Sequence, residues 1–233
     1  MPTRKTIVLL LLAFFLFIFI PKGVLTPIAS RSVANHLLEQ FNAADAEVHM
    51  DSGWGWNLLF GRLPKVELEI KHGFIEDLPV RFISLVGYDV EFDPWELFIN
   101  QNFAYKKSGS MQLEVHVEES GLNDYFWREV DPARNLTVVI GEDVLSLQGV
   151  VSVWNIPWKV MLEGVLDIRN QTALRFVPRN LVVEETRVPP LLLEIINEHY
   201  GLVVDFDSLP FPIVITDVQM EEGAIAVRIG VVE

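Results

Sequence analysis

Residues 176–229 read FVPRNLVVEETRVPPLLLEIINEHYGLVVDFDSLPFPIVITDVQMEEGAIAVRI, and this stretch decides the fold that we expect for the chain. Its pattern predicts a strand, then a helix, then a closing hairpin. Pro189 and Pro190 suit the first turn of a helix, where a missing N–H costs nothing, and Gly201 suits a left-handed C-terminal cap. The helix is therefore predicted from Pro189 to Tyr200.

The predicted helix has a wide apolar face. At about 100° per residue, its large apolar side chains spread over an arc of about 200°. These side chains are Leu191, Leu192, Leu193, Ile195, Ile196 and Tyr200. One flat surface would leave part of this arc exposed, so we expect either a strongly curved sheet or a bound apolar ligand to cover it.

The end of the stretch predicts a hairpin from its local chemistry. Leu209 to Pro212 is an extended segment fixed by two prolines, and alternating side chains follow over 213–220 and 224–229. Glu222 and Gly223 supply the turn between these two strands.

Upstream, the chain alternates as antiparallel strands do, with few helices between them. The expected strands are 47–51, 66–70, 80–92, 111–117, 136–140, 144–153, 158–168, 174–177 and 181–184. An amphipathic helix is expected over Ser30 to Phe41, packed on the domain, and a short helix from Ser120 to about Arg128. The predicted fold class is α+β: a long, strongly curved antiparallel sheet wrapped around one or two amphipathic helices. Because the chain has no repeat and no flexible linker, residues 31–233 are predicted to form one domain.

Residues 1–30 predict a signal peptide or a single transmembrane anchor. Two basic residues precede an uninterrupted apolar run of 14 residues over 7–20, and residues 21–25 would lengthen it to about 19. A retained anchor is favoured, because a cut after Ala29 would have an unsuitable proline two residues before it, and the basic residues place the N-terminus in the cytoplasm. Either alternative puts the rest of the chain on the extracytoplasmic side of the cell membrane.

Composition excludes several classes of protein. The 233 residues are 50% hydrophobic and include no cysteine, which excludes disorder, disulfides and thiolate chemistry. The net charge of −14 is the opposite of what nucleic-acid binding requires, and it disfavours adhesion to an anionic membrane surface by charge. Any lipid binding must therefore come mainly from apolar contact.

Motifs for catalysis are missing from the sequence. The chain lacks a nucleophile elbow, a zincin pair, a phosphate-binding glycine loop and a dinucleotide fingerprint, so we expect no enzyme activity, no catalytic residue, no metal and no cofactor. Two triplets alternate with apolar residues, as on any half-exposed strand, and their parallel side chains do not converge on a metal. The triplets are Glu47, His49 and Asp51, and Glu114, His116 and Glu118. His199, near the end of the predicted helix, is expected to be structural.

Several short motifs, in order along the chain, carry a resemblance to a known family. They are Leu59-Phe60-Gly61, Leu78-Pro79-Val80, Ser120-Gly121-Leu122-Asn123, Leu174, Phe176, Pro178, Pro189 to Leu193, Asp205 to Phe211 and Gly223. Together they resemble the LmeA-like phospholipid-binding family over most of the chain after about residue 31. The resemblance implies phospholipid binding, and a fold similar to tubular lipid-binding proteins, in which a rolled sheet and a helix form an apolar groove.

The expected function is therefore the binding of phospholipid acyl chains by an exported, membrane-tethered domain that serves lipid handling in the cell envelope. At about 0.8 kcal/mol per buried methylene, a sixteen-carbon chain would gain roughly 12 kcal/mol before ordering costs. The residues expected to line or rim the groove are Leu191, Leu192, Ile195, Ile196, Phe211, Ile213, Ile215, Trp54 and Trp56. No basic cluster in the sequence predicts the lipid headgroup.

Two other functions fit the same sequence. A non-catalytic structural or interaction module of the cell envelope would pack its apolar helix fully and present an acidic surface to a protein partner. A hydrolase fits less well, because nothing in the sequence brings a base and a nucleophile together. Unfilled apolar volume is the feature that distinguishes a lipid-binding protein from a packed module.

Overall fold

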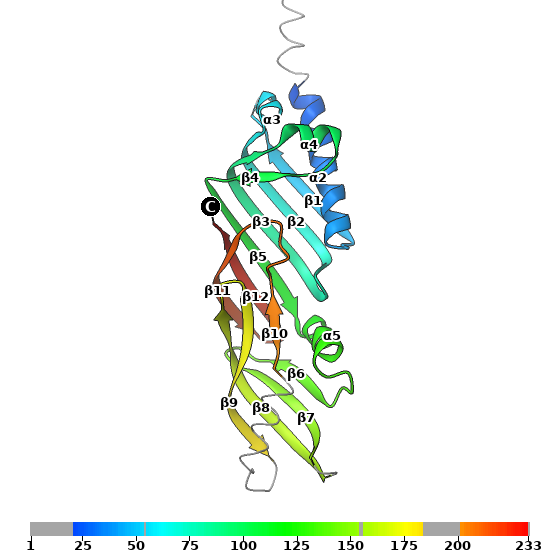
Figure 1. Ribbon diagram of the computed structural model, residues 1–233, viewed down its shortest axis with the longest axis vertical. Coiled ribbons are helices and arrows are strands. Elements are labelled where there is room, and N and C mark those ends of the chain that lie inside the picture. Colours follow the sequence, from blue (N-terminus) through cyan, green and yellow to red (C-terminus); the bar gives the residue numbers. More distant parts are fainter. Residues whose placement is uncertain (1–20, 54, 154–155, 184–200, 233) are drawn as a thin grey trace, which may run out of the picture. The chain divides into compact units, whose positions relative to one another are not determined.

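A computed structural model describes residues 21–53, 55–153, 156–183 and 201–232. These residues form mostly antiparallel sheet with few helices (Figure 1). The helices are the π-helix η1 (Pro21–Leu25), α2 (Thr26–Gln40), α3 (Trp56–Leu59), α4 (Pro94–Ile99) and α5 (Glu119–Glu129). The strands are β1 (Asp45–Asp51), β2 (Arg62–Ile75), β3 (Leu78–Phe92), β4 (Tyr105–Lys107), β5 (Ser110–Glu118), β6 (Leu136–Ile140), β7 (Leu145–Val153), β8 (Ile156–Arg169), β9 (Ala173–Val183), β10 (Val203–Asp205), β11 (Ile213–Glu221) and β12 (Ala224–Val231).

The strands form two sheets where the sequence predicted one long sheet. The seven-stranded sheet has the order β1-β2-β3-β5-β12-β11, with β4 pairing with β3, and the five-stranded sheet has the order β10-β9-β8-β7-β6. The described residues also divide into two compact units. Unit 1 contains residues 21–70 and 84–112, and unit 2 contains residues 71–83 and 113–232. The strands β2, β3 and β5 contribute residues to both units.

In unit 1, α2 packs beside β1 through one apolar stripe. Ala29, Val33, Leu37 and Phe41 follow one another at intervals of four residues, and each is at most 7% exposed. This spacing keeps the four side chains on one face of a helix. The amphipathic helix predicted over Ser30 to Phe41, packed on the domain, is confirmed.

A capping signal at Asp93-Pro94 starts α4, a helix that the strand pattern did not predict. Asp93 Oδ1 accepts hydrogen bonds from the backbone N–H groups of Trp95 at 3.0 Å and Glu96 at 3.4 Å, with Pro94 in the first turn. The Lys106 ammonium, 3.0 Å from Asp93 Oδ2, and these two backbone donors hold the pKa of Asp93 below its ordinary value. The carboxylate therefore stays charged at the helix N-terminus, where negative charge is favourable.

Gly61 lies in the turn between α3 and β2, at a position that only glycine fits. Its φ is +67°, and a Cβ there would overlap the carbonyl oxygen of Phe92. The Phe92 N–H donates to the Gly61 carbonyl at 2.9 Å, so the two segments approach closely because they are hydrogen-bonded to each other. This contact is a physical reason for the glycine in the motif Leu59-Phe60-Gly61.

We expect Gly61→Ala to lower the free energy of unfolding by about 2–3 kcal/mol, because alanine would combine a strained φ with overlap against a backbone atom. Gly223→Ala is the matched control: Gly223 has a φ of +78°, but its Cβ would meet nothing within 4 Å. Only the strain of about 1 kcal/mol is expected there. Urea unfolding followed by circular dichroism measures both losses, and equal losses would contradict the overlap at Phe92.

In unit 2, the side chain of Asn123 takes the place of a neighbouring strand beside the edge strand β6. Asn123 Oδ1 accepts the N–H of Val138, and Asn123 Nδ2 donates to the Val138 carbonyl, each at 2.8 Å. Nδ2 also donates to the Glu119 carbonyl at 2.9 Å, and the residue is only 5% exposed. An unpaired strand edge invites pairing with another chain, so the Asn123 amide both satisfies β6 and closes its edge.

The remaining outward backbone groups of β6 are paired as well, mostly by α5 and the residues around it. At Leu136, the backbone N–H donates to Asp131 Oδ2 and the carbonyl accepts from Trp127 Nε1, each at 2.7 Å. At Ile140, the N–H donates to Glu119 Oε2 at 2.8 Å and the carbonyl accepts from the Gly223 N–H at 3.0 Å. At the opposite edge of the sheet, the Tyr125 hydroxyl of α5 donates to the Val203 carbonyl of β10 at 3.0 Å. Burial raises the pKa of Tyr125, which keeps this donor protonated.

Both edges of the five-stranded sheet therefore meet α5, which means that this sheet is curled into a half-barrel that α5 closes. Leu122 and Phe126 of α5 are fully buried, at 2% and 0% exposure. The short helix predicted from Ser120 to Arg128 and the curvature of the sheet around a helix are both confirmed.

The strand β9 runs unbroken from Ala173 to Val183, where two strands were predicted. The pairing of β9 with β8 shifts by one residue between Glu163 and Gly164, which leaves Arg179 as an extra residue on β9 beside Pro178, a residue that lacks the N–H that regular pairing would require. The other predicted strands are confirmed within a few residues, and α3, β4 and β10 are additions to them.

Two expected elements lie outside the described residues. They are the helix from Pro189 to Tyr200 and the apolar run over 7–20. Within the part of the chain that is described, no helix is both long enough and apolar enough to cross a membrane.

Candidate functional site

A groove of about 600 Å³ lies on one face of the five-stranded sheet in unit 2. It is lined by Thr137, Val139, Gln148, Gly149, Val150, Lys159, Val160, Met161 and Val182. Ligand-binding clefts have volumes of roughly 300–1,000 Å³, so this hollow is large enough for a ligand.

Strand register places the residues at the centre of the groove beside one another. Four residues form one row across β6, β7, β8 and β9 by direct pairing, namely Thr137, Gln148, Met161 and Val182. Residues that pair directly across neighbouring strands have their side chains on the same face of the sheet. Val150 extends the apolar surface in the next row, where it pairs with Lys159.

The opposite face of the same strands is core. Leu136, Val138 and Leu147 are all 0% exposed, so alternation leaves the groove face open to water. A solvated strand face normally carries polar residues, yet here Val150 is 41% and Val182 is 45% exposed. A strip of exposed aliphatic side chains along a groove is suited to holding an apolar chain.

Polar groups in the groove are few. Lys159 is the single cation among the described residues that line it, and its aliphatic stem can lie along apolar surface while the ammonium reaches water. Gln148 Nε2 donates to Ser146 Oγ at 3.0 Å. The described lining of the groove is therefore mainly apolar, with Lys159 as its one cationic side chain.

A second hollow, of about 480 Å³, lies in unit 1 and is polar. It is lined by Lys22, Thr26, Pro27, His49, Met50, Asp51, Ser52, Lys65 and Glu67. Lys65 Nζ lies 2.6 Å from Glu67 Oε1, and the hydroxyls of Thr26 and Ser52 are 2.6 Å apart. Because these polar groups already bond to one another, this hollow suits an acyl chain less well than the groove of unit 2.

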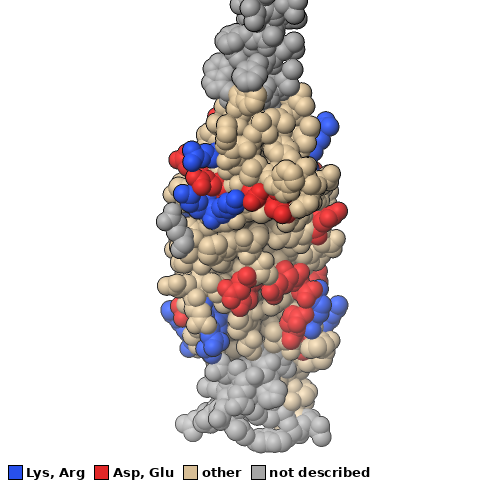
Figure 2. Space-filling model, turned by 45° about the horizontal axis from the view of Figure 1, so that its top comes forward, with Lys and Arg blue, Asp and Glu red and all other residues tan. Residues whose placement is uncertain are grey.

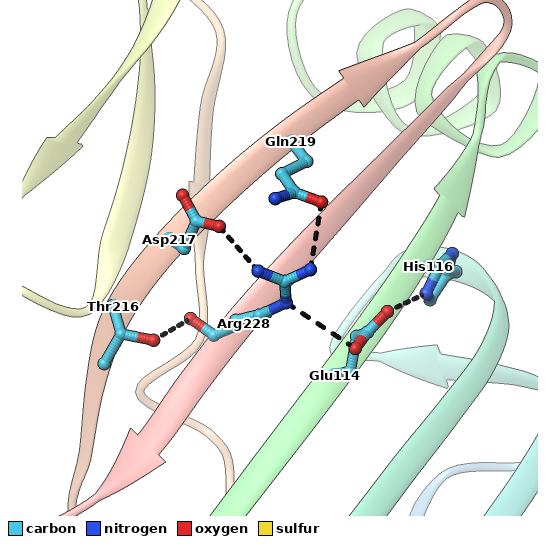
Figure 3. Close-up of polar contacts among 6 residues, drawn as sticks. All are labelled: Glu114, His116, Thr216, Asp217, Gln219 and Arg228. Carbon is cyan, nitrogen blue, oxygen red and sulfur yellow. Dashed lines mark hydrogen bonds and ion pairs between the residues drawn. The ribbon is translucent and has the colours of Figure 1, made fainter.

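Glu114 and His116 belong to a polar ladder that crosses β5, β12 and β11 (Figure 3). Glu114 Oε1 lies 2.6 Å from His116 Nε2, and Glu114 Oε2 lies 3.8 Å from Arg228 Nε. Arg228 also donates to Asp217 at 2.9 Å and to Gln219 at 3.0 Å, so the ladder joins three neighbouring strands. Among the described residues, no group of three or more His, Asp or Glu side chains is placed to hold a metal ion.

The predicted lipid-contacting residues are placed as follows. Leu191, Leu192, Ile195, Ile196 and Trp54 lie outside the described residues. Ile213 and Ile215 are buried on β11 at 6% and 4% exposure, and Phe211 and Trp56 are half-buried. None of these last four lines the groove of unit 2, and their contact with lipid stays a prediction.

The groove residues themselves were not predicted. Val150, Met161 and Val182 read as ordinary members of alternating strands, and only the pairing of the strands brings them together. One signal was available for Met161, which stands between the core residues Val160 and Leu162 at a strand position where a solvated face normally carries a polar side chain.

Comparison with known proteins gives one match. A model of the LmeA-like phospholipid-binding family matches residues 22–229, which is most of the chain. The resemblance seen in the short sequence motifs is thereby confirmed. No curated protein and no solved structure matches the chain.

Proposed function

Because this chain belongs to the LmeA-like phospholipid-binding family, we propose that it holds a phospholipid acyl chain in the groove formed by β6, β7, β8 and β9. One observation carries the proposal: exposed aliphatic side chains line a groove on a strand face that alternation leaves to water. The net charge of −14 does not oppose it, since apolar contact supplies the affinity.

The energetics of such a site are sufficient. At about 0.8 kcal/mol per buried methylene, ten methylenes in the groove would contribute roughly 8 kcal/mol before the cost of association is subtracted. The row from Thr137 to Val182 crosses four strands, so an extended chain would lie across the strand direction and contact each strand once.

Lys159 supplies the polar end of the proposed site. A lysine ammonium binds phosphate oxygens as a point charge, without demanding one geometry. Its place beside Val150 puts this cation next to the apolar strip, where the phosphodiester of a bound lipid would emerge. Catalysis is not part of the proposal, because the family is one of lipid-binding proteins.

We further propose that the protein is exported and stays tethered to the cell membrane by residues 7–20, with its remaining part on the extracytoplasmic side, where it serves lipid handling in the cell envelope. The uninterrupted apolar run after two basic residues supports this location. The alternative is a structural module of the envelope with no lipid ligand, but an open apolar groove favours the lipid-binding function.

Photoreactive lipid provides the test. The full-length chain is reconstituted into vesicles that contain a phosphatidylcholine with a diazirine on one acyl chain, irradiated, digested and analysed by mass spectrometry. We expect labelled peptides from β7, β8 and β9 that contain Val150, Met161 or Val182, because a bound chain would contact these side chains directly.

The pattern of labelling decides between the alternatives. Labelling confined to the apolar run over 7–20 would contradict the groove and favour the structural module. Labelling of β11 at Ile213 or Ile215 would move the acyl site to the residues that the sequence predicted.

A further inference from the structure

A group of strongly exposed apolar side chains lies in unit 1, far along the sequence from the residues of the groove. Phe60, Trp95 and Ile99 are the three most exposed large apolar side chains among the described residues, at 74%, 69% and 59%. Three more belong to the same elements or to their neighbours, with exposures between 44% and 50%. Together they form what we name the apolar end: Val24, Ile28, Leu59, Phe60, Trp95 and Ile99.

These residues come from elements that touch one another. Within unit 1, α3 contacts η1, and α4 contacts α2. The hydrogen bond of 2.9 Å from Phe92 N–H to the Gly61 carbonyl joins the turn after α3 to the segment that leads into α4. Figure 1 shows η1, α3 and α4 at the same end of unit 1. The six side chains therefore belong to one region of the surface.

The short helices of this region turn their apolar residues outward. Leu97 is the only buried residue of α4, and Leu58 is the only buried residue of α3. Trp95 and Ile99 are four residues apart, so they share one face of α4, and that face is exposed. A soluble domain gains nothing from presenting a tryptophan, a phenylalanine and an isoleucine to water, so a partner surface is expected to cover them.

The distribution of charged side chains around the apolar end, and the place where the chain enters the folded part, indicate that the partner surface is a membrane. Figure 2 shows the surface at this end as mostly uncharged, with basic and acidic side chains gathered in a band below it. Ion pairs such as Asp93 with Lys106 and Glu91 with Lys107 lie close to α4 in the fold of unit 1. An aromatic and aliphatic surface bordered by charges suits the boundary between lipid headgroups and acyl chains.

The sequence adds a second argument for a membrane. The apolar run of residues 7–20 ends immediately before η1, and Val24 and Ile28 of the apolar end follow it within eight residues. Lys22 stands between the run and these side chains, where a cation meets lipid phosphates. The chain thus enters its folded part at the same end that exposes Phe60 and Trp95.

We propose that the apolar end rests in the interfacial layer of the membrane that anchors the chain, with Phe60, Trp95 and Ile99 inserted at headgroup depth. The inference rests on the tether over 7–20 and adds to it a second membrane contact, formed by α3 and α4. This contact holds unit 1 against the bilayer surface instead of leaving it free to swing on its tether.

Spin labelling tests the contact, because the natural chain has no cysteine and each introduced one is unique. Phe60→Cys and Ile99→Cys are labelled in the full-length chain and reconstituted into phosphatidylcholine vesicles. Val144→Cys and Ile156→Cys are the matched controls, since these apolar residues of unit 2 are also exposed, at 41% and 52%. Power saturation then compares access of oxygen, which enters lipid, with access of a nickel chelate, which stays in water.

We expect the ratio of oxygen to nickel access to be about threefold or more higher at positions 60 and 99 than at positions 144 and 156, because side chains at headgroup depth meet lipid-soluble oxygen and are shielded from the aqueous chelate. Low access of both reagents at 60 and 99 would indicate a protein contact and overturn the proposal, as would high access of the nickel chelate. Carbonate extraction of the same vesicles separates two failures: release of the chain overturns the tether, whereas a retained chain with water-exposed labels overturns only the docking of α3 and α4.

Discussion

Asn123→Leu is expected to lower the free energy of unfolding by about 4 kcal/mol, since it leaves the N–H and carbonyl of Val138 buried without partners. Leucine has the same number and branching of side-chain heavy atoms as asparagine and a larger volume, so the cost comes from lost hydrogen bonds rather than from a cavity. Urea unfolding followed by circular dichroism measures the loss. Hydrogen exchange adds a local signal, because the Val138 amide should exchange faster than the other amides of β6.

Asp124→Ala is the matched control for this change. Asp124 is the next residue of α5, it is exposed, and its replacement should change the unfolding free energy by no more than about 0.5 kcal/mol. Asn123→Asp separates the two bonds to Val138, because the carboxylate can still accept from the N–H but repels the carbonyl. If Asn123→Leu cost under about 1 kcal/mol and the Val138 amide stayed protected, water would be replacing the side chain at the edge of β6.

Local patterns in the sequence were sufficient for much of the fold. Alternation gave most strands to within a few residues, and a four-residue apolar spacing gave α2. The helix α4 was not predicted, although its start signal, Asp93 followed by Pro94, is local. The helix has only six residues, too few to show a helical pattern beside the long alternating strand that precedes it. The division into two sheets depends on which strands pair, and no local pattern of the chain contains that information.

The edge of β6 shows why side-chain roles were harder to predict than strands. Asn123 stands in the motif Ser120-Gly121-Leu122-Asn123, yet its partner is Val138, fifteen residues later. Gly121 has a similar non-local reason, since a Cβ there would lie 2.7 Å from the Pro79 carbonyl oxygen. Both residues are explained by contacts between α5 and strands that the sequence alone does not bring together.

The groove could not be predicted for the same reason. Met161, Gln148 and Val182 lie in one row only because of the register that joins β7, β8 and β9. A shift of one residue in any of these pairs would turn a groove side chain into the core. The sequence pattern instead favoured the widest apolar face in the chain, on the helix predicted from Pro189 to Tyr200. That helix lies outside the described residues.

Met161→Glu is expected to reduce photolabelling of the β7–β9 peptides by about thirtyfold, since it removes roughly 2 kcal/mol of apolar contact at the centre of the groove and every 1.4 kcal/mol is tenfold in affinity. The introduced carboxylate would also have to lose its hydration for an acyl chain to bind beside it, which further disfavours binding. The measurement is the yield of lipid-labelled peptide after irradiation, compared with that of the unmodified chain in the same vesicles. Met161 is only half-buried, so the thermal transition should change little.

Two further variants show whether the loss belongs to the groove. Val144→Glu adds the same charge at an exposed aliphatic residue of unit 2 that does not line the groove, and it should leave labelling within about twofold. Met161→Leu keeps the apolar contact and should also retain most of the labelling. If Met161→Glu and Val144→Glu reduced labelling equally, added negative charge would be the cause and the acyl chain would lie elsewhere. Loss in Met161→Glu alone would locate the lipid on the strand row that includes Gln148 and Val182.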